Sequence, residues 1–417
     1  MVVGQRTDSG ENSAGVELLC DAVDVHPDWP VRATSGRRWH DLPHLGRPTW
    51  LRLRRFRRDG PGGSRSHTRP PLLIGPPLLM TTRLAEAAIL RCLTTPLARV
   101  AGELGVPPRK LRLLLARFLT DFAAAYRPAA ADALGLDGVH IGGATWTVIA
   151  DIEGNCLIDL LDDHNANSLA AALANLQRRD LVRLVAIDAS TLERAAVRTV
   201  FPDPPLEAGQ RVILALDRRH ATALVLKPLA LLRKSLGFTQ QRQRVATSGR
   251  RRVDTLKALL ERPNRALDDD QRSWLAAQFS ARPGGERLRA AYEAKEAFLA
   301  LWDVPDRLRA AQTFSTWRRD LAAAGLADLY ATAVTTLGRD WRDEFLAAVA
   351  RPGAGTGYVE ALNRELKRLY GDTRGNASFP LLRARMLFAH GRPDTQALIV
   401  RLASRVAAEL ADDGSRP

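Results

Sequence analysis

Between residues 133 and 217 the apolar positions form short runs typical of strands, separated by two segments with helical spacing. The pattern predicts strands at 134–141, 145–152 and 156–161, a helix at 167–177, a strand at 183–188, a helix at 192–200 and a strand at 211–217. Turn signals at Gly142-Gly143 and Glu153-Gly154-Asn155 join the first three strands, which indicates an antiparallel meander.

Three strands followed by alternating helices and strands is the order of a ribonuclease-H-like fold. In that fold the first and fourth strands are neighbours. Asp137 lies within the first predicted strand and Asp188 ends the fourth. The pattern therefore predicts that these two carboxylates lie side by side at one edge of the sheet.

The stretch from 238 to 350 has an almost entirely helical pattern, and we expect an all-α insertion there. Its large apolar side chains are Trp274, Trp302, Trp317 and Trp341. Core packing is the first interpretation of these tryptophans, and stacking on DNA bases is the alternative. The stretch is too long for a loop.

Residues 95–119 have the pattern of a helix-turn-helix. Thr95 would cap the first helix, Pro96 would start it, and Gly105 would allow a left-handed turn. The second helix, from 107 to 119, would present Arg109, Lys110 and Arg112 near its N-terminal end, where a recognition helix meets DNA. An ordinary helical hairpin is the alternative.

The chain of 417 residues has a net charge of +15, which favours a polyanionic partner. Residues 31–70 hold eleven arginines against two aspartates, and residues 50–54 alternate as a strand. We expect a DNA-facing arm with contacts from Arg52, Arg54, Arg55 and Arg57; a disordered basic segment is the alternative. Without a long apolar run or an apolar leader, the chain is expected to be cytoplasmic and associated with the nucleoid, with no membrane partner.

Only three cysteines are present, and they lie far apart. A structural zinc site needs four cysteine or histidine ligands. Cys20, His26, His40 and His67 could offer only an improvised set, so we expect no zinc.

Three carboxylates stand in contexts suited to metal binding: Asp137, Asp188 and Glu360. Hard oxygen ligands suit magnesium or manganese. Asp217 is a rival to Asp188, because it also follows an apolar run; it would otherwise support the site or cap a helix. Glu360, Asn363 and Lys367 share one face of a predicted helix. Asn363 and Lys367 would contact metal or DNA, or else form a solvated polar face.

Several motifs together resemble the ISL-three group of bacterial insertion-sequence DDE transposases. They are Leu-Gly-Leu-Asp137, Val-Ala-Ile-Asp188, Leu-Asp217-Arg-Arg-His220 and Gly-Tyr-Val-Glu360-Ala-Leu-Asn363-Arg-Glu-Leu-Lys367. The resemblance runs from about residue 36 to residue 390. The cysteine pairs of that family's N-terminal zinc ribbon are missing.

The resemblance implies binding of double-stranded DNA at transposon ends, then cleavage and strand transfer with two magnesium ions held by Asp137, Asp188 and Glu360. Asp217, Arg218 and His220 would position DNA or support the site, and a homodimer or larger assembly would form on DNA. A decayed DNA-binding relative and a nuclease on the same fold are the alternatives. Expected regions are a degenerate zinc-ribbon-like arm (1–80), the helix-turn-helix (81–128), the catalytic core (129–237), the insertion (238–350), the closing helix with Glu360 (351–392) and a C-terminal helix and tail (393–417).

Overall fold

A computed structural model of the chain describes residues 2–7, 16–21, 31–61, 65–67, 72–202, 212–239, 242–247, 250–304, 306–351, 353, 355–373 and 377–413. Within these ranges, residues 2–7, 16–21, 31–37, 53–58, 65–67, 243–247, 250–254 and 413 are described by their backbone alone. The chain forms two compact units. Unit 1 combines Met1–Arg127 with Glu365–Pro417, and unit 2 is Pro128–Arg364.

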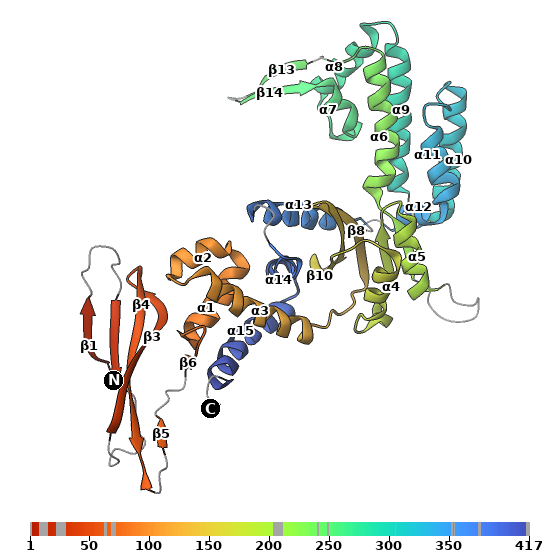
Figure 1. Ribbon diagram of the computed structural model, residues 1–417. Coiled ribbons are helices and arrows are strands. Elements are labelled where there is room, and N and C mark those ends of the chain that lie inside the picture. Colours follow the sequence, from red (N-terminus) through yellow and green to blue (C-terminus); the bar gives the residue numbers. More distant parts are fainter. Residues whose placement is uncertain are drawn as a thin grey trace. The chain divides into compact units, whose positions relative to one another are not determined.

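Unit 2 contains a five-stranded mixed sheet (Figure 1). Its strands are β8 (Ala133–Ile141), β9 (Ala144–Asp151), β10 (Cys156–Leu161), β11 (Leu184–Ile187) and β12 (Ile213–Leu216). The order across the sheet is β10-β9-β8-β11-β12, with β10, β9 and β8 antiparallel and β8, β11 and β12 parallel. The predicted neighbourhood of the first and fourth strands is thus confirmed.

Two helices lie between strands of the sheet in chain order, one between β10 and β11 and one between β11 and β12. They are α4 (Ala166–Ala174) and α5 (Thr191–Val200), and both were predicted within a few residues of their bounds. Asn165 caps α4 and Ser190 caps α5, because each side-chain oxygen accepts a backbone N–H of the first turn. The fold of unit 2 around the sheet is therefore of the mixed α/β type.

The rest of unit 2 follows β12. The elements are α6 (Arg218–Ser235), β13 (Arg242–Thr247), β14 (Arg250–Thr255), α7 (Leu256–Glu261), α8 (Asp269–Ser280), α9 (Gly285–Ala300), α10 (Arg307–Ala323), α11 (Ala331–Thr335), α12 (Arg342–Val349) and the first part of α13 (Gly357–Asp372). Short helical turns lie at Arg179–Leu181, Asn264–Ala266, Leu301–Asp303 and Thr336–Asp340. Helices α6 and α9 lie side by side (Figure 1).

The all-helical prediction for 238–350 is wrong at one place, because β13 and β14 pair as an antiparallel ribbon. The cause is local. Val245, Thr247, Val253 and Thr255 are β-branched and favour extended backbone, and they flank a Ser-Gly turn signal.

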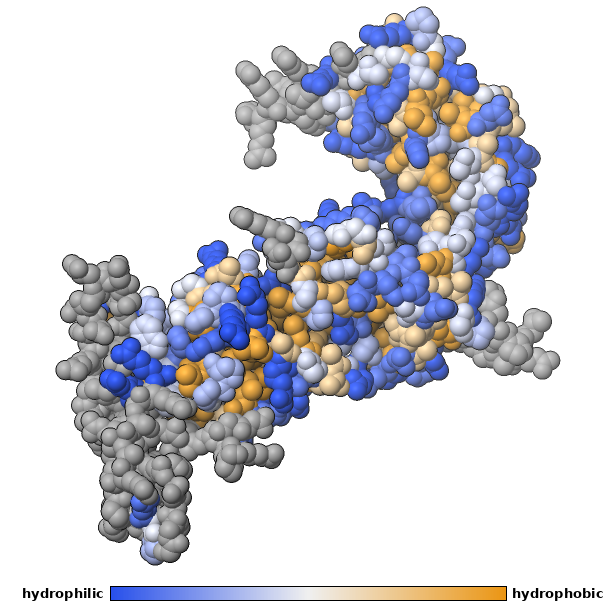
Figure 2. Space-filling view, in the orientation of Figure 1, coloured by the Kyte–Doolittle hydropathy of each residue, from blue (hydrophilic) through white to orange (hydrophobic). Residues whose placement is uncertain are grey.

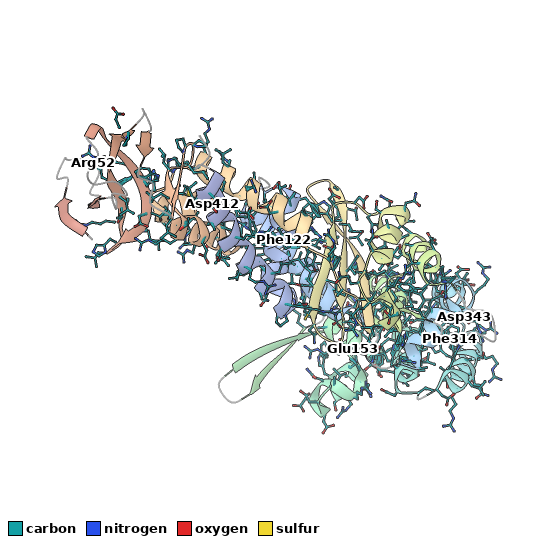
Figure 3. All side chains as sticks on the ribbon, turned by 90° about the horizontal axis from the view of Figure 1, so that it is seen from below. Arg52, Phe122, Glu153, Phe314, Asp343 and Asp412 are labelled. Atoms are coloured by element: carbon teal, nitrogen blue, oxygen red, sulfur yellow. The ribbon has the colours of Figure 1, made fainter. Side chains whose placement is uncertain are left out.

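Aromatic side chains form the core of the helical part of unit 2. The Phe298 ring stacks on Phe345 with centroids 5.9 Å apart, and Trp302 and Trp317 pack against the same Phe298. Phe314, labelled in Figure 3, lies among them, with its ring centroid 5.3 Å from that of Phe345. Trp302, Trp317 and Trp341 are buried, so core packing is confirmed for these three tryptophans. Hydrophilic residues cover much of the outer face of these helices in the view of Figure 2.

Unit 1 has a second sheet and a helical part. Its strands are β1 (Val2–Thr7), β2 (Val16–Asp21), β3 (Val31–His44), β4 (Arg47–Asp59), β5 (Arg65–His67), β6 (Leu73–Ile74) and β7 (Met80–Thr81). Its helices are α1 (Thr82–Thr94), α2 (Leu97–Leu104), α3 (Pro108–Ala125), the last part of α13, α14 (Phe379–His390) and α15 (Pro393–Asp413). The strand predicted around Trp50 is confirmed as part of β4.

Helices α2 and α3 lie where the helix-turn-helix pattern predicts two helices. Gly105 between them has φ 64°, which favours glycine, and a Cβ on it would lie 2.7 Å from Pro48 Cβ. Phe122 of α3 stacks on Tyr126 with centroids 5.3 Å apart (Figure 3). The buried Arg385 of α14 donates to the carbonyls of Cys92 and Thr95 and so holds α14 against the end of α1. Across the ranges given above, no helix combines the length and apolarity that a bilayer crossing requires.

Gly135 generates a prediction about stability. A Cβ at this position of β8 would lie 2.4 Å from Ile152 Cγ2 and 2.8 Å from Val359 Cγ2. Gly135→Ala should therefore overpack the contact between β8 and α13 and lower the free energy of unfolding by about 1–3 kcal/mol, as measured by denaturant unfolding.

Gly357→Ala is the matched control, because nothing lies within 4 Å of a Cβ at this position of α13. Its stability should change by less than about 0.5 kcal/mol. A change in the free energy of unfolding that is no larger in Gly135→Ala than in Gly357→Ala would show that the contact at Gly135 tolerates a methyl group.

Candidate active site

One pocket of about 340 Å³ brings together four acidic residues of unit 2. It is lined by Asp137, Asp188, Asp217, Arg219, His220, Ala223, Thr356 and Glu360. The three carboxylates expected from the sequence thus come together, although Asp188 and Glu360 are 360 − 188 = 172 positions apart.

The register of the parallel strands aligns the three aspartates. Ala186 pairs with Gly135, so two positions further along Asp188 stands opposite Asp137. Ile187 pairs with Leu216, so one position further along Asp188 stands opposite Asp217. Because neighbouring strands lie about 4.8 Å apart, this register places the three acids in a row, with Asp137 in the middle of β8 and Asp188 and Asp217 just after the ends of β11 and β12.

Asp137 is the most perturbed of the pocket carboxylates. Burial, together with the charges of Asp188 and Asp217, raises its pKa to about 6 against the opposing hydrogen bonds of Gly138 and Asn363. The side-chain amide of Asn363 donates to Asp137 Oδ2 over 2.6 Å. Asn363 is buried, so this part of the predicted polar face of α13 is not solvated.

Asp188 and Asp217 differ in what their oxygens do. Asp217 is 2% exposed, and its two oxygens accept the backbone N–H groups of His220 and Thr356 over 3.3 and 3.1 Å. It therefore caps α6 and ties the residue before α13 to the end of β12. The side chain of Asp188 is 35% exposed and lies at the pocket, with Oδ2 3.7 Å from His220 Nδ1. Asp188 is the freer of the two acids to bind a ligand.

Glu360 and His220 interact with other charged side chains of the pocket. The Glu360 carboxylate is paired with the Arg219 guanidinium. The interaction with Asp188 raises the pKa of His220 against the opposing effect of burial. The pocket therefore balances its acids with an arginine and a readily protonated histidine.

The donor set fits a hard divalent cation. Carboxylate oxygens are the ligands that magnesium and manganese prefer. The pKa of Asp137 is raised first by burial and then by repulsion from Asp188, and a bound cation would relieve that repulsion. As the side chains stand in the described ranges, no three acid, histidine or cysteine groups are already close enough to hold a metal ion. The pairing of Glu360 with Arg219 would have to open for Glu360 to become a ligand.

The sequence analysis missed a buried acid behind the pocket. Glu193 of α5 is 1% exposed, and burial together with the charges of Asp188 and Asp137 raises its pKa to about 8. Its carboxylate accepts the backbone N–H of Asp188. A signal was present, because Ser190 and Glu193 have the spacing of a capping box; here only the Ser190 half forms.

His164 lies beside Glu193. Its Nε2 lies 3.9 Å from Glu193 Oε1, and its Nδ1 lies 2.9 Å from the Thr147 hydroxyl. A Cβ on Gly138 would lie 2.9 Å from the His164 ring. The glycine that follows Asp137 therefore leaves room for this histidine.

The other predicted site residues lie outside the pocket. Arg218 is exposed at the start of α6 and Lys367 is exposed on the part of α13 that belongs to unit 1. In unit 1, Arg52, Arg109 and Arg112 are exposed, whereas Lys110 is half-buried. Burial, together with the charge of Lys110, lowers the pKa of His40 to about 4. The side chains of Arg54, Arg55, Arg57, Cys20 and His67, and all of His26, lie outside the described residues.

Asp137 generates a prediction about pH. The folded protein keeps the Asp137 proton up to about pH 6, whereas an ordinary aspartate releases it near 3.8. Between these values the folded state binds more protons, so Asp137 lowers the free energy of unfolding as pH rises. In metal-free protein, Asp137→Asn should thus gain stability over the wild type between pH 4 and 6 and keep that gain at pH 7, as measured by thermal unfolding. A difference that does not vary with pH would contradict the raised pKa.

Comparison with known proteins agrees with this arrangement. No curated protein matches the chain. A family model described as a transposase, the DDE model of the ISL-three type, matches residues 134–386. The match covers more than half of the 417 residues. It includes every residue that lines the acidic pocket. The chain therefore belongs to the ISL-three family of DDE transposases.

Proposed function

We propose that the protein binds the ends of an insertion sequence and catalyses metal-dependent DNA cleavage and strand transfer at the acidic pocket. The observation that carries this proposal is the pocket itself. Asp137, Asp188 and Glu360 come from three separate elements and line one space. A transposase acts on DNA, and cleavage at phosphorus needs the charge compensation that such a carboxylate set supports when metal is bound.

We infer a ribonuclease-H-like fold for the catalytic core. The sheet order β10-β9-β8-β11-β12, with three antiparallel strands followed by two parallel ones, supports it. This fold places its second carboxylate after the strand beside β8, which is the position of Asp188. The two engaged oxygens of Asp217 favour the same assignment.

Asp137, Asp188 and Glu360 would hold two magnesium or manganese ions. When bound, such a pair activates a water or a 3′-hydroxyl and stabilises the leaving oxygen of an in-line displacement. Asn363 would keep Asp137 Oδ2 oriented through its hydrogen bond. Arg219, released from Glu360, would be free to meet a phosphate of the DNA.

The remaining polar residues would position DNA. His220 faces Asp188 and would keep that carboxylate in place, and Asp217 would hold α13 to the sheet. Arg218 and Lys367, both exposed, would contact phosphates. In unit 1, helices α2 and α3 would act as a helix-turn-helix, and the basic hairpin of β3 and β4 would add contacts that do not depend on sequence. We expect two or more chains to assemble on paired ends.

A DNA-binding relative without catalysis is the alternative. The missing cysteines of the N-terminal region favour it, whereas the complete carboxylate set in one pocket favours the enzyme. The experiment that separates them is incubation of purified protein with magnesium and labelled DNA that carries the flanks of its own gene.

The first functional prediction concerns the carboxylates. Asp137→Asn, Asp188→Asn and Glu360→Gln should each lower strand cleavage by more than about a hundredfold, because each removes a charged ligand and keeps the shape of the side chain. DNA binding, measured by mobility shift, should persist. Asp217→Asn is the matched control. It should lose stability, because the two Asp217 oxygens each accept a backbone N–H and an asparagine side chain has only one acceptor oxygen. It should still cleave DNA. An inactive Asp217→Asn beside an active Asp188→Asn would reverse the assignment.

The second functional prediction concerns recognition. Replacing the exposed Arg109 and Arg112 by glutamine should weaken binding to the element's ends more than binding to random DNA. Arg52→Gln should weaken both equally and reduce the slope of log K against log salt by about 1. Titrations at several salt concentrations separate the two effects. If the substitutions of Arg109 and Arg112 weaken binding to both DNAs alike, α3 contacts only phosphates and does not recognise sequence.

A further inference from the structure

A second, smaller pocket of unit 2 lies beside the acidic one, and none of the described residues that line it is acidic. Its volume is about 210 Å³, and its lining includes Arg218, Trp302, Ala348, Val349 and Arg351. This volume is below the 300–1,000 Å³ typical of sites for drug-sized molecules. The pocket therefore suits a small group or one segment of a chain molecule.

The polar side chains that line this pocket are all hydrogen-bond donors. Arg218 and Arg351 are cationic and exposed. Trp302 is 5% exposed, and its indole Nε1 is buried without a hydrogen-bond acceptor anywhere in the described part of the chain. Neighbouring Trp317 differs, because its Nε1 donates to the Ala294 carbonyl over 2.8 Å.

An unpaired buried N–H is unfavourable, and an acceptor that reaches it would relieve the cost. The Arg218 guanidinium lies 5.1 Å from the centre of the Trp302 ring, so one ligand that reaches the indole also meets a positive charge. Three donors in a pocket whose described lining contains no acid favour an anion with several acceptor oxygens. A phosphate group has this chemistry.

Chain connectivity places the pocket next to the acidic one. Arg218 and Gly355 line the second pocket, whereas their chain neighbours Asp217 and Thr356 line the acidic pocket. Arg218 and Arg219 also point to different sides of α6, because successive helical residues do not share a face. A DNA strand that enters the acidic pocket can thus reach the second pocket within a few nucleotides.

We propose that this pocket, formed by Arg218, Arg351 and Trp302, holds a backbone phosphate of the transposon strand within a few nucleotides of the cleaved bond. The proposal rests on the proposed function. The phosphate accepts from both guanidinium groups, and the Trp302 ring has to turn for its buried indole N–H to donate as well. The phosphate then fixes the register of the strand relative to Asp137, Asp188 and Glu360.

The test uses the full chain and a duplex that carries the element's end, with calcium in place of magnesium so that binding is measured without cleavage. Arg351→Gln should weaken binding about tenfold. Arg342→Gln is the matched control, since Arg342 is an exposed arginine of the adjacent α12 that lines neither pocket; it should change affinity by less than about twofold. Trp302→Phe removes the N–H, keeps an aromatic ring and should also weaken binding.

The phosphate is then located with duplexes that each carry one uncharged methylphosphonate near the cleavage site. At one position the methylphosphonate should weaken wild-type binding about tenfold and add nothing in Arg351→Gln, which is the signature of a direct contact. Losses of affinity from the methylphosphonate and from Arg351→Gln that simply add at every position would overturn the proposal. If the coupling is found but magnesium supports no cleavage of the same duplex by the wild type, the phosphate pocket stands and the proposed catalysis fails.

Discussion

The parallel pairing of β8 with β11 and of β11 with β12 is the constraint on which the site depends. The pairing sets the register that brings Asp137, Asp188 and Asp217 into one row. A shift of one residue would turn a side chain to the opposite face of the sheet. Negative charges at strand spacing repel one another, and the pKa of Asp137, raised to about 6, records part of that repulsion. The register therefore concentrates negative charge in one pocket.

The fourth acid reaches this row because α13 packs closely on the sheet. Gly135 leaves space for Val359, and Asp217 accepts the backbone N–H of Thr356 just before the helix begins. Asn363 then hydrogen-bonds Asp137 from the next turn of α13. Both oxygens of Asp217 are thus engaged in positioning α6 and α13, whereas the carboxylate of Asp188 is more exposed at the pocket. Glu193 supports Asp188 from behind by accepting its backbone N–H.

Much of this arrangement could be predicted from the sequence, because it depends on local signals. Apolar runs and turn residues marked β8 to β12, and the family motifs marked Asp137, Asp188 and Glu360. The ribbon of β13 and β14 was missed because a helical pattern surrounds it on both sides. Glu193 was missed because it has the position of an ordinary capping residue, and only the tertiary fold brings His164 and Asp188 against it. Similarly, Arg351 and Trp302 are 49 positions apart in sequence, 351 − 302 = 49, so no local pattern connects them.

Counting the bound metal ions tests the central claim most directly, because it needs no knowledge of the element's ends. Titration of the full chain with manganese, followed by electron paramagnetic resonance, should show two ions per wild-type chain and a loss of binding in Asp188→Asn, while Asp217→Asn keeps both ions. Undiminished binding in Asp188→Asn, together with loss in Asp217→Asn, would contradict the account of how the row of acids is used.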